Sequence, residues 1–402
     1  MSYSNSNEIM QIADEHIIHT YNRYPIVLDH GDGVYLYDTQ GKKYLDFGAG
    51  IAVYAFGYNN KEFNDALKTQ LDKLIHTSNY FYNEPMAEAA RKLTAVSGMD
   101  KVFFTNSGTE AIEGALKLAK KFGYLRDGRT DHEVIAMGHS FHGRSMGALA
   151  LTGNKHYQEA FGPMIPGIRF AEYNDLDSVK ELVNEKTIAV ILETVQGEGG
   201  IYPAEPEFLE GIRRICDEKG MLMMLDEIQC GLCRTGSVYA FMQYGVIPDV
   251  VATAKALGQG VPVGAFMARG EAAQALVPGD HGTTYGGNPF AAAAVCKTLD
   301  MIESYDLTEH VKAVTPVLEA ALDELVAEYD FVTERRGKGL MQGIVVTIPT
   351  GDIIKKALEE GLILFSAGSD VVRFVPPLVI TAEHVREMKD KLTKIFEGFR
   401  NK

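Results

Sequence analysis

Cysteine is scarce in this sequence, with four residues in a chain of 402. So few cysteines in so long a chain do not form a disulfide framework. Cys230 and Cys233 make one CxxC pair, there is no second such pair, and His139 with His142 is a close histidine pair. Structural zinc sites combine four such ligands at short spacings. We therefore expect no metal site, and a zinc or dithiol protein built on this pair is an alternative hypothesis.

Long hydrophobic runs and an excess of basic residues are also missing. No apolar run reaches the roughly 20 residues that span a bilayer. Lys and Arg number 39 against 54 Asp and Glu, which gives a formal net charge of −15. Nucleic acid and anionic membranes attract clustered cations, so neither is expected as a partner. The start, MSYSNSNEIMQIADEH, has no basic region followed by an apolar stretch, and we expect a cytoplasmic location.

The hydrophobic pattern predicts two domains. Apolar residues recur at helical spacing in 60–74 and 85–96, GDGVYLYDTQGKKYLDF alternates like an antiparallel meander, and charged amphipathic helices alternate with two strands near the C-terminus. A chain of 402 residues is long enough for this division. We expect an N-terminal segment at 1–50 that joins the small domain, a large domain at 51–290, and a smaller α+β domain at 291–402.

Two short apolar runs end abruptly in a charged residue. Residues 221–225 precede Asp226, and residues 250–254 precede Lys255. Runs of this length predict strands that are buried on both faces of a parallel sheet. The carboxyl ends of such strands face the crevice where α/β proteins bind ligands, so we expect an anion and an amine in one pocket. Ordinary strand-end loops that carry these charges are the alternative.

An acidic group and a half-buried lysine suit pyridoxal phosphate, which needs a Schiff-base lysine and an acidic partner for its ring nitrogen. This cofactor also needs a phosphate site. Residues 101–123 read as a strand, an NSG turn and an amphipathic helix, so the helix start with Ser107 and Thr109 offers N–H and hydroxyl groups to a phosphate. A capping box between Ser107 and Glu110 is the alternative. Neither GQGVPVG nor GKGLMQG has the glycine spacing of a dinucleotide site.

Other polar residues follow predicted strands. Phe141 and Arg144 lie in a loop after HEVIAMG, where they offer a flat aromatic face and a guanidinium group, or else form an ordinary solvated loop. Glu193 and Glu198 follow another buried strand and either pair with an arginine or face water. Arg373 lies inside an apolar strand, and it should have an anionic partner because an unpaired buried charge is costly.

Together these motifs resemble the class III, ornithine-type pyridoxal-phosphate aminotransferases of fold type I. The resemblance covers nearly the whole chain, in family order: LDFGAGIAV, HTSNYFYNEP, FTNSGTEA, FHGRS, ETVQGEGG, LDEIQCG, RTG, AKALGQGVPVGA, HGTTYGGNP and AGSDVVRFVPPL. It implies an α/β fold with a large domain, whose central sheet is mostly parallel and flanked by helices, and a smaller α+β domain. It also implies a homodimer with active sites at the subunit interface.

The resemblance implies a set of cofactor and catalytic residues. Lys255 forms the Schiff base with pyridoxal 5′-phosphate and moves a proton in the reaction, while Asp226 keeps the ring nitrogen protonated. The remaining residues expected at the cofactor are Ser107, Gly108 and Thr109 at the phosphate, Phe141 on the ring face, Gln229 near the ring oxygen, and Thr284 reaching the phosphate from the partner subunit.

The resemblance also implies how two substrates share one pocket. Arg144 binds the α-carboxylate of the amine donor, and Arg373 binds that of glutamate or 2-oxoglutarate. Glu198 covers Arg373 while the donor is present. Tyr21 matches a position at which ornithine aminotransferases contact the free α-amine.

The members that the chain most resembles transfer the terminal amine of N2-acetyl-L-ornithine to 2-oxoglutarate in arginine biosynthesis. AGSDVVRF and FYNEP favour the acetylated donor. Ornithine, succinylornithine and 4-aminobutyrate are alternative donors, and a non-catalytic binding protein on the same scaffold is the alternative of another class. The chain departs from the family at three places. Cys233 stands where a glycine or small residue is usual, Gln259 interrupts the expected glycine run, and YNNKE follows Gly57 in place of the usual sequence.

Overall fold

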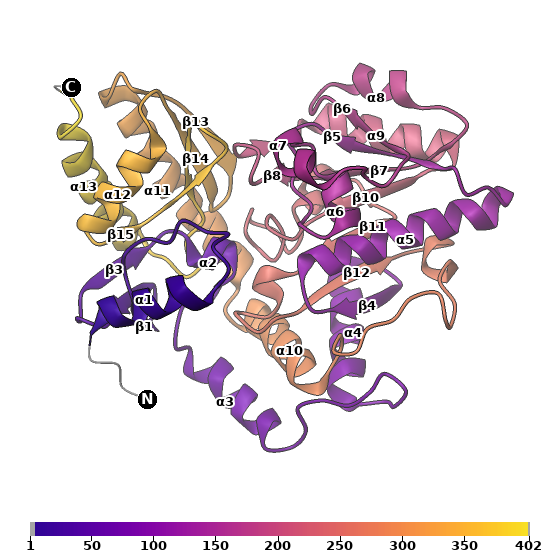
Figure 1. Ribbon diagram of the computed structural model, residues 1–402, viewed down its shortest axis with the longest axis horizontal. Helices are drawn as coiled ribbons and strands as arrows, with labels where there is room; N and C mark the ends of the chain where they lie inside the picture. The colour runs from indigo at the N-terminus through magenta and orange to yellow at the C-terminus, as the bar shows by residue number, and fades with distance from the viewer. Residues whose placement is uncertain (1–4, 401–402) are drawn as a thin grey trace.

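A seven-stranded sheet forms the centre of the larger part of the molecule (Figure 1). The computed structural model describes residues 5–400, so the first four residues of the predicted N-terminal segment lie outside the described part. The strands lie in the order β4-β12-β11-β10-β7-β5-β6, and β12 alone runs antiparallel to its neighbours. They are β4 (Lys101–Thr105), β5 (Glu133–Met137), β6 (Ile168–Ala171), β7 (Thr187–Glu193), β10 (Leu222–Asp226), β11 (Val250–Thr253) and β12 (Gly264–Ala268).

Helices cover both faces of this sheet, which is why its central strands are apolar throughout. Every residue of β7 and β10 is buried, as their unbroken apolar runs predict. Met224 packs in the cluster that contains α5, whereas Met223 and Leu225 pack on the opposite face with α9. The covering helices are α5 (Gly108–Asp127), α6 (Met146–Leu151), α8 (Leu176–Leu182) and α9 (Pro206–Lys219).

A second region joins the two ends of the chain. The N-terminal meander shares a sheet with β15, which pairs with β3, and a further sheet has the order β13-β14-β17-β16. Its strands are β1 (Leu28–Asp32), β2 (Tyr35–Asp38), β3 (Lys43–Asp46), β13 (Val332–Lys338), β14 (Met341–Val346), β15 (Leu362–Ile363), β16 (Phe365–Ala367) and β17 (Val371–Phe374). Its helices are α1 (Ser6–His16), α11 (Leu307–Glu328), α12 (Thr350–Glu359) and α13 (Ala382–Glu397).

Helix α10 (Pro289–Ser304) packs against α3 (Lys61–Leu71) and α4 (Glu84–Ser97) beside the large sheet. The predicted domain boundaries at residues 50 and 290 stay a prediction. The short elements are α2 (Ala49–Ala52), α7 (Lys155–Gln158), β8 (Val195–Gln196), β9 (Tyr202–Pro203), η1 (Glu159–Phe161), η2 (Ala240–Tyr244), η3 (Lys255–Leu257) and η4 (Ala272–Gln274). No helix within residues 5–400 is both long and apolar enough to cross a membrane.

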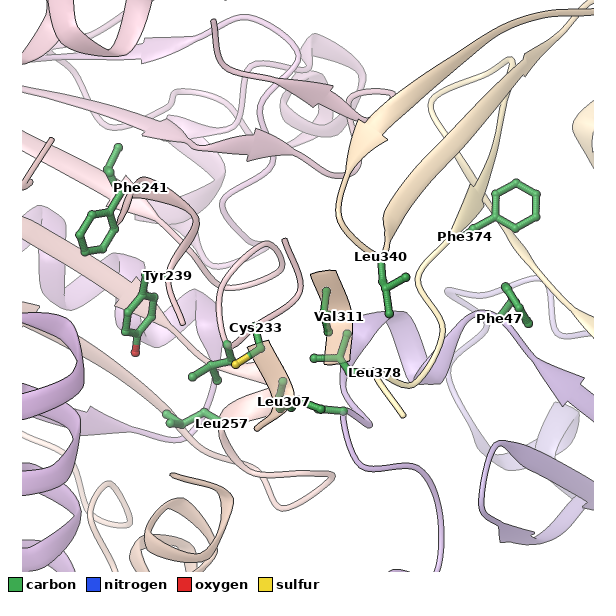
Figure 2. Packing of buried hydrophobic residues seen from close by; sticks show 14 of the residues in the cluster. Phe47, Cys233, Tyr239, Phe241, Leu257, Leu307, Val311, Leu340, Phe374 and Leu378 are labelled. Atoms are coloured by element: carbon green, nitrogen blue, oxygen red, sulfur yellow. The ribbon is translucent and has the colours of Figure 1, made fainter. Parts of the chain in front are cut away.

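The CxxC pair lies in the core. Figure 2 shows Cys233 in the same apolar cluster as Leu257, Leu307 and Val311, where the two regions meet. Cys230 and Cys233 are buried free thiols, and burial raises the pKa of Cys233 to about 12 and that of Cys230 well above its ordinary value. Because the thiolate is the reactive form, these thiols are poor nucleophiles. Among residues 5–400 there is no group of three or more His, Cys, Asp or Glu placed to hold a metal.

Candidate active site

Asp226 and Lys255 lie together at the carboxyl edge of the large sheet. β10 ends in Asp226, and its parallel neighbour β11 ends just before Lys255. Both residues line a cavity of about 410 Å³. Six further predicted residues line the same cavity: Ser107, Gly108, Thr109, Phe141, Arg144 and Gln229. The strand-end charges therefore share one pocket with the predicted phosphate, ring and carboxylate groups.

Lys255 is held in a strained backbone conformation. Its φ is +47°, a left-handed value that costs a residue with a side chain roughly 1–3 kcal/mol. Burial lowers the pKa of its amine and the Arg373 charge acts in the same direction, while Glu198 and Asp226 oppose them. The amine has no hydrogen-bond or ion-pair partner within residues 5–400. A deprotonated amine is both a nucleophile and a base, so the site can supply either function.

His142 is a residue of the site whose contact the sequence did not reveal. Its Nδ1 lies 2.8 Å from Asp226 Oδ2, and both side chains are buried. Burial disfavours the imidazolium form, but the hydrogen bond and charge of Asp226 outweigh it and raise the pKa of His142. The N–H of Ile228 donates to Asp226 Oδ1 at 3.0 Å. These two contacts orient the Asp226 carboxylate.

Glu193 neither pairs with an arginine nor faces water, which were the two outcomes expected for it. Its side chain is buried and accepts hydrogen bonds from the N–H groups of Phe141 and Gly197, each at 3.2 Å. Burial is the main cause that raises the pKa of Glu193 to about 7. Glu193 therefore ties the loop that carries Phe141 to the end of β7.

The start of α5 offers unpaired N–H groups to the cavity. Ser107 Oγ accepts the N–H of Glu110 at 3.3 Å, but the Glu110 carboxylate accepts the N–H of Asn106 at 2.7 Å, so only half of the expected capping box forms. The N–H groups in the first turn of a helix have no intrahelical carbonyl. A Cβ on Gly108 would lie 2.9 Å from Ile228, so glycine keeps this cradle open for an anion.

Arg373 has the anionic partner that its position in an apolar strand predicts. Its Nη1 donates to Glu198 Oε1 at 2.5 Å and to Gln229 Oε1 at 3.1 Å. Burial disfavours the carboxylate, but the charges of Arg373 and Lys255 outweigh it and lower the pKa of Glu198. Gln229 also donates to Glu198 at 3.4 Å, so the three side chains form one closed polar group beside the lysine.

The guanidinium group of Arg144, unlike that of Arg373, is not covered by a carboxylate of the described residues. It is exposed at the wall of the cavity, and no carboxylate within residues 5–400 lies at ion-pair distance from it. Its Cζ lies 3.8 Å from the ring centre of Tyr157 and 5.3 Å from that of Phe141. The guanidinium is thus free to receive a carboxylate from a ligand.

Four predicted residues are not part of the wall of this cavity. Glu198 and Arg373 are connected to it through their hydrogen bonds with the lining residue Gln229, whereas Tyr21 and Thr284 lie elsewhere. Tyr21 is 72% exposed, and Thr284 is exposed in the loop before α10. Neither contributes to the cavity wall. The predicted contact of Tyr21 with the donor, and that of Thr284 with a partner's cofactor, stay predictions.

These residues fit pyridoxal 5′-phosphate on the chemistry of their groups. A phosphate needs unpaired N–H donors in an open cradle. The first turn of α5 provides them at Gly108, which has no side chain, and at Thr109, which adds a hydroxyl. A pyridinium nitrogen needs an oriented carboxyl group, as Asp226 provides with His142 behind it. A carbonyl group needs an amine with a lowered pKa, as Lys255 provides.

The chain belongs to the class III aminotransferase family, because the family description "Aminotransferase class-III" matches residues 17–396. This membership confirms the predicted α/β aminotransferase fold, and the predicted pyridoxal-phosphate dependence. Aminotransferases act on pairs of amino-acid and oxo-acid substrates.

Individual relatives are similar along nearly their whole length. The chain is 42% identical over 387 residues to an acetylornithine aminotransferase from Methanocaldococcus jannaschii, which covers 96% of this chain and 97% of the relative. The fold also matches a structure of ornithine aminotransferase from Toxoplasma gondii, with a TM-score of 0.94 and 31% identity over 99% of this chain and 96% of that one. That structure is described as having partial occupancy of PLP at its active site. Acetylornithine aminotransferase from Elizabethkingia anophelis matches with a TM-score of 0.89 and 30% identity, over 99% of this chain and 100% of that one.

Proposed function

We propose that the protein transfers the terminal amine of N2-acetyl-L-ornithine to 2-oxoglutarate, giving N-acetyl-L-glutamate 5-semialdehyde and L-glutamate in arginine biosynthesis. The observation that carries this proposal is the contrast between two arginines. Arg144 is open in the wall of the cavity, whereas Arg373 is covered by Glu198 and bonded to the cavity residue Gln229. The similarity to the acetylornithine aminotransferase of Methanocaldococcus jannaschii supports it.

Pyridoxal 5′-phosphate, when bound, supplies the carbonyl that receives the amine and a ring that withdraws electrons from the reacting carbon. Ser107, Gly108 and Thr109 would hold its phosphate, and Phe141 would face its ring. The lowered pKa of Lys255 suits its amine to take a proton from the reacting carbon and to return one later.

The two arginines divide the substrates between them. The donor presents a neutral aliphatic arm near the reacting amine and an α-carboxylate at its far end, which Arg144 receives. The acceptor presents a carboxylate close to its reacting carbon, which Arg373 receives after Glu198 moves away. One pocket thereby accepts an uncharged arm in one half-reaction and an anion in the other.

The test is a single-turnover comparison of donors. The holoenzyme is mixed separately with N2-acetylornithine, ornithine, N2-succinylornithine and 4-aminobutyrate, and loss of the cofactor's absorbance is followed. We expect N2-acetylornithine to react fastest, and Lys255→Ala to abolish turnover with the fold intact. Faster reaction with ornithine would contradict the donor and turn attention to Tyr21. Turnover by Lys255→Ala at the unaltered rate would contradict the role of the lysine.

A non-catalytic binding protein on this scaffold is disfavoured, since such a protein has no need of a buried, unpartnered lysine beside an oriented aspartate. A homodimer in which Thr284 reaches the cofactor of the partner subunit is part of this proposal, and a cytoplasmic location remains the expectation from the sequence.

A further inference from the structure

We propose that Tyr157 is a positioning residue for the amine donor, because its ring holds the Arg144 guanidinium where the donor's α-carboxylate binds. The proposal rests on the function proposed above and adds to it a residue that decides donor affinity. Tyr157 was not among the residues that the sequence singled out.

The geometry is that of a cation held over an aromatic face. Arg144 Cζ lies 3.8 Å from the ring centre of Tyr157, well within the ~6 Å over which such attraction acts. The Tyr157 ring in turn meets the Phe141 ring edge-on, with centres 6.2 Å apart and planes at 85°. Tyr157 therefore joins the residue expected on the cofactor ring to the residue expected on the donor's carboxylate.

Tyr157 is itself fixed in place. It lies in α7, whose Gln158 Nε2 donates to the carbonyls of Leu149 and Thr152, each at 2.9 Å. These carbonyls lie at the end of α6, and Arg144 directly precedes the first turn of the same helix. The cation and the ring are thus both anchored to α6.

The ring, rather than the hydroxyl, makes the contact. The Tyr157 hydroxyl has no hydrogen-bond partner within residues 5–400. An exposed arginine without such a platform samples many rotamers, and ordering it on binding costs affinity. Arg373 is held separately by Glu198 and Gln229, so the acceptor should not depend on Tyr157.

The experiment compares Tyr157→Leu with Tyr157→Phe and with a matched control, His156→Leu. The control removes a neighbouring ring from the same helix, and the His156 side chain is 82% exposed. Tyr157→Leu should raise the KM for N2-acetylornithine about 3- to 10-fold with little change in kcat or in the KM for 2-oxoglutarate. Tyr157→Phe and His156→Leu should behave like the unaltered protein. An equal rise in both KM values, or the same loss in Tyr157→Phe, would overturn the proposal.

Two further ligands separate this proposal from the donor assignment. N2-Acetylnorvaline lacks the terminal amine, so calorimetric titration of the holoenzyme measures its binding alone, and Tyr157→Leu should weaken that binding by the same factor as the KM. Unchanged binding would overturn the role of Tyr157. N-Acetylputrescine lacks the α-carboxylate, so its reaction should not change in Tyr157→Leu. If the unaltered protein does not prefer N2-acetylornithine to N-acetylputrescine, the donor assignment itself is wrong.

Discussion

At the scale of single residues, the proposed choice between substrates depends on the charged groups beside Lys255. Glu198 is held against Arg373 by its charge and by Gln229. This covered arrangement of Arg373 is the one that we propose for the half-reaction with the donor. Uncovering Arg373 requires only that one side chain of intermediate exposure swing away.

Glu198→Ala should impair the half-reaction with N2-acetylornithine more than the half-reaction with glutamate. Without Glu198, Arg373 is a buried charge beside the neutral arm of the donor, whereas glutamate supplies its own carboxylate. Loss of one partner of a buried pair costs on the order of 3 kcal/mol, so we expect roughly a 100-fold loss for the donor half-reaction. Single-turnover rates with each substrate measure the two effects, and equal effects on both would contradict the switch.

The sequence predicted those residues of the site that a short stretch of neighbouring residues makes recognisable. Asp226 and Lys255 end apolar runs, and Arg373 interrupts one, so each is visible in a short window of sequence. The contact of His142 with Asp226 spans 84 positions, and nothing near His142 in the sequence indicates it. The stacking of Tyr157 on Arg144 depends on how α7 folds back on α6, which also has no local signal.

At the scale of elements, the loop after β10 is built around a buried carboxylate. Glu227 accepts hydrogen bonds from the Thr194 hydroxyl at 2.6 Å and from the N–H groups of Ala240 and Phe241 at 2.8 and 3.0 Å. Burial raises the pKa of Glu227 to about 7 from 4.5. This loop carries Gln229 and follows Asp226, so its stability bears directly on the site.

The free energy of unfolding should therefore fall as pH rises from about 4.5 to about 7, and level off above that. In this range the folded chain keeps a proton on Glu227 that the unfolded chain has lost, so raising the pH favours unfolding by up to about 1.4 kcal/mol per pH unit for each such group. Glu193, with its pKa also raised to about 7, acts in the same direction.

Urea unfolding at several pH values, with the unaltered protein and with Glu227→Gln, measures how the free energy of unfolding depends on pH. The variant should be less stable at every pH, because the NH₂ group of its amide would face a backbone N–H, and two donors cannot form a hydrogen bond. Its free energy of unfolding should also depend less on pH. Some dependence should persist through Glu193. An unchanged slope in Glu227→Gln would show that Glu227 does not hold the proton.

Some elements followed from the sequence, whereas others, including α8, α9 and β12, were not predicted. Strands with unbroken apolar runs and helices with clear periodicity, such as β7 and α11, form where they were expected. The sequence did not predict β12, because its five residues, GAFMA, follow glycine-rich turns and include a glycine. Cys233 and Gln259, two departures from the family, both have positive φ, which explains why glycine suits these positions.

At the scale of the whole molecule, exposed aromatic side chains gather around Thr284. Tyr80 and Tyr82 are 95% and 102% exposed, and Asn79 donates hydrogen bonds to the carbonyls of Thr283 and Gly286. An apolar patch of this kind is typical of a protein interface. In the proposed homodimer this patch would contact the partner subunit, because Thr284 is expected at the partner's cofactor.

Introducing two charges here, as Phe81→Glu with Tyr82→Glu, should produce monomers and weaken binding of pyridoxal phosphate at least 10-fold, since the proposed Thr284 contact is lost. Sedimentation velocity measures the assembly, and titration with the cofactor measures its affinity. Tyr124→Glu, at an exposed aromatic near the far end of α5, is the control and should leave both unchanged. A monomer with full cofactor affinity would contradict a shared site. Such assembly could not be derived from local sequence patterns, because the partner surface belongs to another chain.

In the proposed cycle, the closed pair of Arg373 and Glu198 makes acceptor binding an exchange of ions. One carboxylate leaves the guanidinium as another arrives, so the number of ion pairs at Arg373 stays the same. At Arg144 the donor creates an ion pair where none existed, on a chain whose net charge of −15 repels anions. Dissolved salt screens a newly formed, exposed pair more than a buried exchange. The ionic strength of the surroundings thus acts on the two halves of the cycle unequally.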